Sequence, residues 1–215
     1  SKEHHRSFKY DINKDGKEVR RTLVLVHPYV ALEIVQFYRD YAGFMVNSCS
    51  RSSYTLRHPT RIAHKRKNLQ GASSLKEITD EDVIELPRNY FFYEPIKNIN
   101  RFYEGGLLER LECRFEHMYV SDMKHCFDNI PAHRFAEAVY VTDRATLTPS
   151  TFPIKAVNIM KEMTNGNKGV AIGPEFSRVF AEIVLQRIDS EIEKKMEDKG
   201  LIQQKDYVCL RYVDD

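Results

Sequence analysis

The order of apolar and polar positions predicts a chain that combines long helices with short strands. The clearest helix begins at Pro174, and its apolar side chains recur every three or four residues until Gly200 ends the pattern. A second helical stripe covers residues 28–46 and also begins with a proline. Three short apolar runs are typical of strands, namely residues 22–26, 118–123 and 207–213. We therefore expect an α+β fold in which antiparallel strands are backed by helices.

Weaker patterns complete this outline. Four further segments show helical spacing of apolar residues or a helix-starting proline, namely 95–105, 107–115, 131–141 and 154–163. Thr79 with Asp82 three residues later has the form of a capping box, which predicts a short helix there. Residues 47–74 are rich in Ser, Arg and His, and we expect a loop or irregular structure.

The distribution of charge along the chain indicates which class of partner the protein could bind. The chain has 215 residues and a net charge of only +2, yet residues 41–76 contain no acidic residue and seven Arg or Lys. A local excess of this kind favours a polyanionic partner, although a solvated basic loop has the same composition. No apolar run approaches the roughly 18 residues of a membrane span, and no secretion leader is visible. We therefore expect a cytoplasmic protein without a membrane partner.

Three aspartates carry the candidate chemistry. Asp214 and Asp215 directly follow one apolar run, and Asp122 lies near the end of another. Adjacent carboxylates repel each other and need a cation, and hard divalent ions such as Mg²⁺ prefer oxygen ligands. Three carboxylates at one place suit a two-metal site for phosphoryl transfer. An Asp-Asp pair at an ordinary turn, unrelated to Asp122, is the alternative interpretation.

The context of these aspartates resembles the reverse transcriptases. The run Tyr-Val-Asp-Asp at 212–215 is similar to their YxDD box. The run Asp-Met-Lys-His-Cys-Phe-Asp-Asn-Ile at 122–130 resembles their first palm motif. Residues 169–189, which begin Gly-Val-Ala-Ile-Gly-Pro-Glu-Phe-Ser, resemble the second palm motif and its helix. The three motifs occur in the family's order, and each falls on the expected type of element.

Further residues narrow the resemblance to the abortive-infection and defence-associated bacterial reverse transcriptases. Ordinary retroelement enzymes have Pro-Gln-Gly where this chain has Ala171-Ile172-Gly173. The run from Ile172 to Ile183, and parts of the stretches 21–28, 53–59 and 111–112, are similar to the defence group. Ile172 replaces a glutamine that contacts the nucleotide in the family. Some members of that group are associated with protein-primed or untemplated DNA synthesis, so the resemblance does not by itself imply that this chain copies a template.

This resemblance implies the fingers and palm of a right-handed polymerase, with largely helical fingers and an antiparallel palm sheet backed by helices. The fingers and N-terminal region would cover residues 1–106, and the first part of the palm residues 107–141. A return segment at 142–168 would lead to the second part of the palm at 169–215. We expect a fragment that lacks the thumb and is incomplete as an enzyme.

The resemblance also implies roles for single residues. Asp122, Asp214 and Asp215 would hold two Mg²⁺ ions, or Mn²⁺ as a substitute, with the Met123 carbonyl as an additional ligand. Phe127 would be a steric gate that excludes the 2′-hydroxyl of ribonucleotides, although a core Phe is the simpler alternative. The remaining expected contacts to the nucleotide or template are Gly173, Pro174, Ser177, Arg57 and Arg51.

The implied activity is that of an RNA-directed or untemplated DNA polymerase in antiphage defence. It would add dNTPs to a nucleic-acid or protein hydroxyl, with RNA and nascent DNA as partners in the bacterial cytoplasm, as a monomer or homo-oligomer. One alternative is a retron or group II intron type of reverse transcriptase that copies a dedicated RNA. Another is a polymerase-like RNA-binding module without catalysis.

Overall fold

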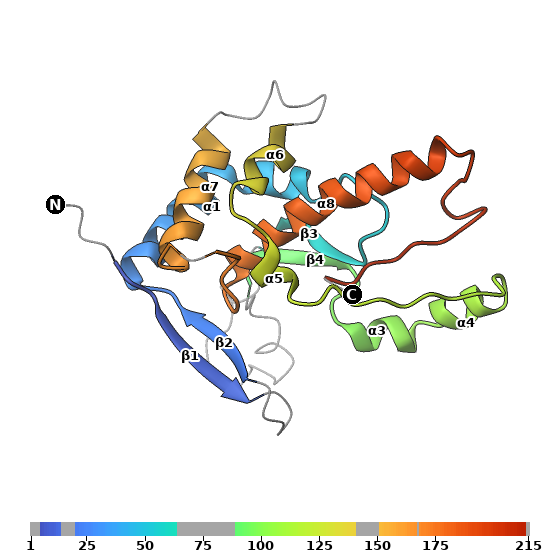
Figure 1. The fold of residues 1–215 in the computed structure, drawn as a ribbon, viewed down its shortest axis with the longest axis horizontal. Coiled ribbons are helices and arrows are strands. Elements are labelled where there is room, and N and C mark those ends of the chain that lie inside the picture. Colours follow the sequence, from blue (N-terminus) through green and yellow to red (C-terminus); the bar gives the residue numbers. More distant parts are fainter. Residues whose placement is uncertain (1–4, 14–19, 64–88, 141–150, 167, 214–215) are drawn as a thin grey trace, which may run out of the picture.

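The computed structural model describes residues 5–13, 20–63, 89–140, 151–166 and 168–213, and its elements surround one long helix near the C-terminal end (Figure 1). The helices are α1 (Pro28–Ser48), α3 (Ile99–Glu104), α4 (Leu107–Glu112), α5 (Cys126–Asn129), α6 (Arg134–Tyr140), α7 (Thr151–Met163) and α8 (Glu175–Glu197). The strands are β1 (Phe8–Asn13), β2 (Arg20–Leu25), β3 (Arg57–Ile62) and β4 (Phe91–Pro95).

The hydrophobic core is built around α8, as the apolar stripe of that helix predicts. Phe176 and Phe180 are 2% and 0% exposed. The ring of Phe176 packs on Phe37 of α1, with ring centroids 5.5 Å apart, and the ring of Phe180 stacks on Phe135 of α6 at 4.2 Å. Burying each large apolar side chain contributes about 1.5–3 kcal/mol before entropy is subtracted. The first half of the stripe is thus buried as expected, and in the described part of the chain helices α1 and α6 cover it, whereas Ile188 and Ile192 further along α8 are 45% and 43% exposed.

The described strands form two separate two-stranded antiparallel sheets, the first of which is the β1–β2 hairpin. Strand β1 pairs with β2 along its whole length, and β3 pairs with β4 with an irregularity between Pro59 and Arg61. The amide of Val24 in β2 also donates to the Ile172 carbonyl at 2.9 Å, which ties the first hairpin to the chain just before α8. The fold is therefore mixed α and β, as predicted.

The predicted strands at 118–123 and 207–213 are wrong, because neither is an element of a sheet in the structure. Met118, Tyr119 and Val120 are 64%, 94% and 82% exposed. A strand persists only when its backbone groups find a partner, and these two segments do not pair with each other. Instead, Arg211 makes an isolated bridge with Thr55, so the second segment follows the loop before β3.

The prediction of a loop over residues 47–74 is also wrong in part, because β3 lies within it and pairs with the unpredicted β4. The helix expected from Pro95 begins at Ile99, since the side chain of Asn98 caps it by accepting the Arg101 amide at 3.1 Å. The short helix expected after Thr79 lies outside the described residues. In the described part of the chain, no helix is long and apolar enough to cross a membrane.

Candidate active site

A buried guanidinium fixes the segment that leads to the aspartate pair. Arg211 forms two hydrogen bonds with the Glu182 carboxylate, at 2.9 and 2.8 Å, and a third with Asp189 at 2.9 Å. All three side chains are at most 7% exposed. Arg211 also donates to the backbone carbonyl of Val213, whose φ angle of 64° is left-handed. The chain is thus held against α8 up to the residue that precedes Asp214.

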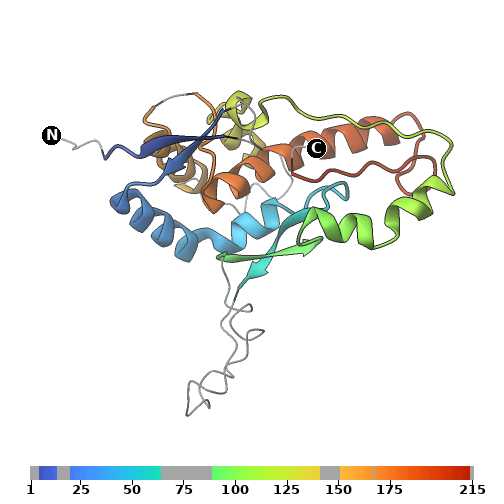
Figure 2. The same cartoon turned by 90° about the horizontal axis from the view of Figure 1, so that it is seen from below.

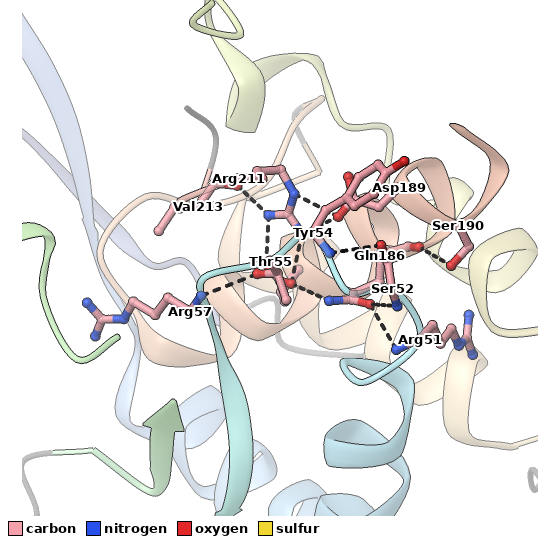
Figure 3. A network of polar contacts seen from close by, with 11 residues as sticks. Arg51, Ser52, Tyr54, Thr55, Arg57, Gln186, Asp189, Ser190, Arg211 and Val213 are labelled. Atoms are coloured by element: carbon pink, nitrogen blue, oxygen red, sulfur yellow. Dashed lines mark hydrogen bonds and ion pairs between the residues drawn. The ribbon is translucent and has the colours of Figure 1, made fainter. Parts of the chain in front are cut away.

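The same network reaches the loop before β3 through a buried amide. Gln186 is fully buried, and its oxygen accepts the backbone amides of Arg51 at 2.9 Å and Ser52 at 2.7 Å (Figure 3). Its nitrogen donates to Glu182 at 2.9 Å. Three segments distant in the sequence, namely the loop at 51–57, the middle of α8 and residues 211–213, are therefore joined by one set of polar contacts.

The charges in this network stabilise the protonated guanidinium. Burial lowers the pKa of Arg211, but the hydrogen bonds and charges of Glu182 and Asp189 outweigh that effect, so its pKa lies above the ordinary value. Burial raises the pKa of Asp189 despite its contact with Arg211. Removal of the guanidinium would therefore leave two buried carboxylates without a counter-ion.

A second group of cations lies beside the same segment. The guanidinium of Arg57, at the start of β3, donates to the Tyr212 hydroxyl at 3.1 Å and lies 4.9 Å from the centroid of the Tyr93 ring. The guanidinium of Arg178, in the first turn of α8, lies 5.8 Å from the same ring centroid. Neither arginine forms an ion pair with any residue that the structure describes. Both positive charges are thus available to an anion near residue 212.

The beginning of α8 is fastened to β4. The Glu175 carboxylate accepts the amides of Tyr90 at 2.7 Å and Phe91 at 3.3 Å and the hydroxyl of Tyr93 at 3.0 Å. Pro174 is the N-cap residue of the helix, and Gly173 before it has a φ angle of 122° that favours glycine. Gly173 is exposed, and a Cβ atom at this position would lie 3.5 Å from the Val24 carbonyl oxygen of β2.

Asp122 lies on an exposed segment that runs from α4 to α5. This segment and residues 201–213 both return from the C-terminal end of α8, where Arg114 donates to the Gln204 carbonyl (Figures 1 and 2). Asp122 is exposed, and among the described residues its carboxylate has no ion-pair partner. The Met123 carbonyl accepts the amide of Cys126 at 3.0 Å in the turn before α5, and its second lone pair is not used by this bond.

Phe127 lies where the first motif meets the second. It is half-buried against the hydrophobic core, and its carbonyl accepts the Val170 amide at 2.7 Å. Gly169 packs so closely here that a Cβ atom would lie 2.8 Å from the Asp128 carbonyl oxygen. The structure therefore brings the turn after Asp122 together with the segment that precedes α8.

Two expected nucleotide contacts lie elsewhere. Ser177 is 1% exposed, and its hydroxyl has no hydrogen-bond partner among the described residues, so it lies in the core instead of facing a groove. On α8, Ser177 shares its face with Ala181 and Val184, which are also buried. The guanidinium of Arg51 is turned toward α6, where it donates to the Ala138 carbonyl. Asp214 and Asp215 lie outside the described residues.

Sequence reasoning missed Arg178, Arg211 and the acids that bind Arg211. Glu182, Gln186 and Asp189 are spaced by four and three residues, which places them on one face of α8 within its apolar stripe. Polar residues on a buried face need partners, and Arg211 is the one charged residue in the run 207–213. These two observations together would have predicted the ion pairs.

Compared with known proteins, the chain matches no family model, no curated protein and no solved structure. Among the residues that the structure describes, no group of three or more His, Cys, Asp or Glu side chains forms a metal-binding cluster. The functional interpretation consequently depends on the motifs and on the contacts described above.

Proposed function

We propose that the chain is the fingers and palm part of a DNA polymerase of the reverse-transcriptase type, which joins dNTPs to a hydroxyl primer. The single observation that supports this best is the fixation of residues 211–213. A buried ion-pair network holds the segment before Asp214 and Asp215 beside two guanidinium groups that form no ion pair with any described residue. Acidic metal ligands next to cations are the arrangement that a triphosphate substrate requires.

In this proposal, the carboxylates and guanidinium groups have different tasks. Asp122, Asp214 and Asp215 would hold two Mg²⁺ ions, which would supply charge stabilisation to the attacking and leaving oxygens. The free, exposed carboxylate of Asp122 fits this role. Arg57 and Arg178 would bind the phosphates of the incoming nucleotide, because guanidinium donors match phosphate oxygens in geometry and charge.

The remaining residues would position the nucleotide. Phe127 would exclude the 2′-hydroxyl by its volume, and Gly173 would allow the nucleotide or template to approach the backbone before α8. Arg51 and Ser177 are not part of this proposal, because the first bonds to α6 and the second is buried. The defence role, the bacterial cytoplasm and the RNA partner follow from the motif resemblance alone and remain part of the proposal.

The experiment is a dNTP incorporation assay with the full-length protein. Wild type should incorporate labelled dNTP in the presence of Mg²⁺ and stop when EDTA is added. Asp122→Asn and Asp214→Asn should each reduce incorporation by at least about a hundredfold, since each removes a metal ligand. Asp198→Asn, an exposed carboxylate at the end of α8, is the matched control and should retain activity. A folded wild type that binds RNA but incorporates no nucleotide would favour the non-catalytic module instead.

A further inference from the structure

The β1–β2 hairpin presents an apolar face that the proposed polymerase chemistry does not use. The register pairs Phe8 with Leu25, Tyr10 with Leu23 and Ile12 with Arg21, so these side chains share one face of the hairpin. The exposed fractions of Phe8, Tyr10, Ile12 and Leu25 are 65%, 42%, 40% and 63%. We call this surface the hairpin face, with the members Phe8, Tyr10, Ile12, Arg21, Leu23 and Leu25.

Two aromatic rings on this face are already arranged for stacking. Phe8 and Tyr10 lie at alternate positions of one strand, and their rings are nearly parallel, at 16°, with centroids 6.3 Å apart. Rings at alternate positions of an exposed strand can each stack on an unpaired base, and such stacking tolerates any base. Aromatic rings that remain exposed to water contribute little to the stability of a two-stranded sheet. A bound ligand is therefore the better explanation of why both rings lie on this surface.

The charges around the hairpin face favour a polyanion. Arg6 and Arg21 are exposed, and neither of them forms an ion pair with a residue in the described ranges. Lys9 alternates with the two rings and lies on the opposite face. Asp11, the acid described in these two strands, lies on the opposite face, where its carboxylate accepts the Thr22 hydroxyl at 2.7 Å. The cations would therefore meet phosphates while the rings meet bases.

The hairpin is also held firmly on the body of the protein. The side-chain oxygen of Asn165 accepts the Ser7 amide at 3.0 Å, and its nitrogen donates to the Ser7 carbonyl at the same distance. The Ser7 hydroxyl accepts the His27 amide at 3.3 Å, which closes the base of the hairpin. A surface fixed in this way binds with less loss of conformational entropy than a mobile loop.

We propose that the hairpin face binds single-stranded nucleic acid by stacking bases on Phe8 and Tyr10 and by contacting phosphates with Arg6 and Arg21. This site is independent of the proposed catalytic residues. Because Val24 bonds to Ile172, the strand bound here would lie next to the start of α8. Paired bases have no free faces, so duplexes should bind this surface much more weakly.

The test is fluorescence anisotropy of a labelled 12-nucleotide oligouridine with the full-length protein. The double variant Phe8→Leu and Tyr10→Leu keeps apolar volume but removes the rings. It should bind at least about tenfold more weakly, since stacking of one base alone is worth about 5- to 150-fold. Tyr103→Leu removes an aromatic ring that is 59% exposed on α3 and should bind like wild type. Arg21→Gln should reduce the slope of log affinity against log salt by about 0.7.

Several results would overturn the proposal. Equal affinity of wild type and the double leucine variant for the oligouridine would show that the strand binds elsewhere. Equal affinity of wild type for the oligouridine and for a 12-base-pair duplex would remove stacking as the mechanism. Sedimentation that shows a wild-type dimer, and a monomer for the double variant, would assign the face to a second copy of the chain. Circular dichroism spectra that match wild type confirm that the variants are folded.

Discussion

Replacement of Arg211 by methionine tests whether the ion-pair network fixes the C-terminal segment. Methionine keeps much of the volume but removes the charge and the guanidinium donors to Glu182, Asp189 and the Val213 carbonyl, while Gln186 still donates to Glu182. Breaking one partner out of a buried ion pair typically costs about 3–5 kcal/mol, because the remaining charge stays buried without compensation. Two carboxylates lose their partner here, and both are at most 7% exposed. We therefore expect the free energy of unfolding of Arg211→Met to fall by at least about 3 kcal/mol.

The measurement is urea unfolding of the full-length protein followed by far-ultraviolet circular dichroism, since the described chain contains no tryptophan reporter. Arg134→Met is the matched control, because Arg134 forms an ion pair with Glu137 in which both side chains are more than half exposed. Exposed pairs contribute about 0–1 kcal/mol, so this variant should be nearly as stable as wild type. A triple variant that also carries Glu182→Gln and Asp189→Asn should regain part of the loss. Equal costs for Arg211→Met and Arg134→Met would refute the reasoning.

Three further predictions test neighbouring parts of the account. Gly169→Ala should lower the free energy of unfolding by more than about 1 kcal/mol, because the φ angle of Gly169 is 90° and the new Cβ would meet the Asp128 backbone. Gly43→Ala in α1 is the control: its new Cβ meets nothing within 4 Å, so the free energy of unfolding should rise by about 0.5–1 kcal/mol. Urea unfolding of both variants measures these changes. Burial lowers the pKa of His58, so the unfolded chain takes up the proton first, and stability should fall as pH drops below about 6.5 with a slope of at most about 1.4 kcal/mol per pH unit from this group. His58→Gln should flatten that pH dependence, and an unchanged slope would assign it to other groups. Phe127→Ala should raise the ratio of kcat/KM for an NTP to kcat/KM for the matching dNTP, by about tenfold for each 1.4 kcal/mol of steric clash removed. If the variant still incorporates dNTPs and this ratio is unchanged, Phe127 has a role in core packing and not in substrate selection.

The helices could be predicted from sequence because their apolar stripes determine which face is buried. The stripe of α8, with Phe176 and Phe180, lies in the core as its spacing requires. The end of α1 and the position of α7 also follow from local patterns. The start of α3 was misplaced, because Pro95 resembled a helix start while the true cap is Asn98.

The strands could not be predicted in the same way, because a strand depends on a partner that may be distant in the sequence. Residues 118–123 have strand composition but no partner among the described strands, whereas β3 has a loop-like composition and pairs with β4. The role of Arg211 could not be predicted for the same reason, because its ion-pair partners Glu182 and Asp189 lie on α8, far from it in the sequence. Local composition therefore predicted the motifs but not the contacts that hold them.

The central claim is that Asp122 and the aspartate pair form one two-metal site. Mn²⁺ binding to the full-length protein, measured by electron paramagnetic resonance with a non-hydrolysable dNTP analogue present, tests it most directly. We expect two ions per chain in wild type and in Asp198→Asn, and fewer in both Asp122→Asn and Asp214→Asn. An Asp122→Asn variant that still binds two ions with the affinity of wild type would contradict the claim, because Asp122 would then lie outside the metal site.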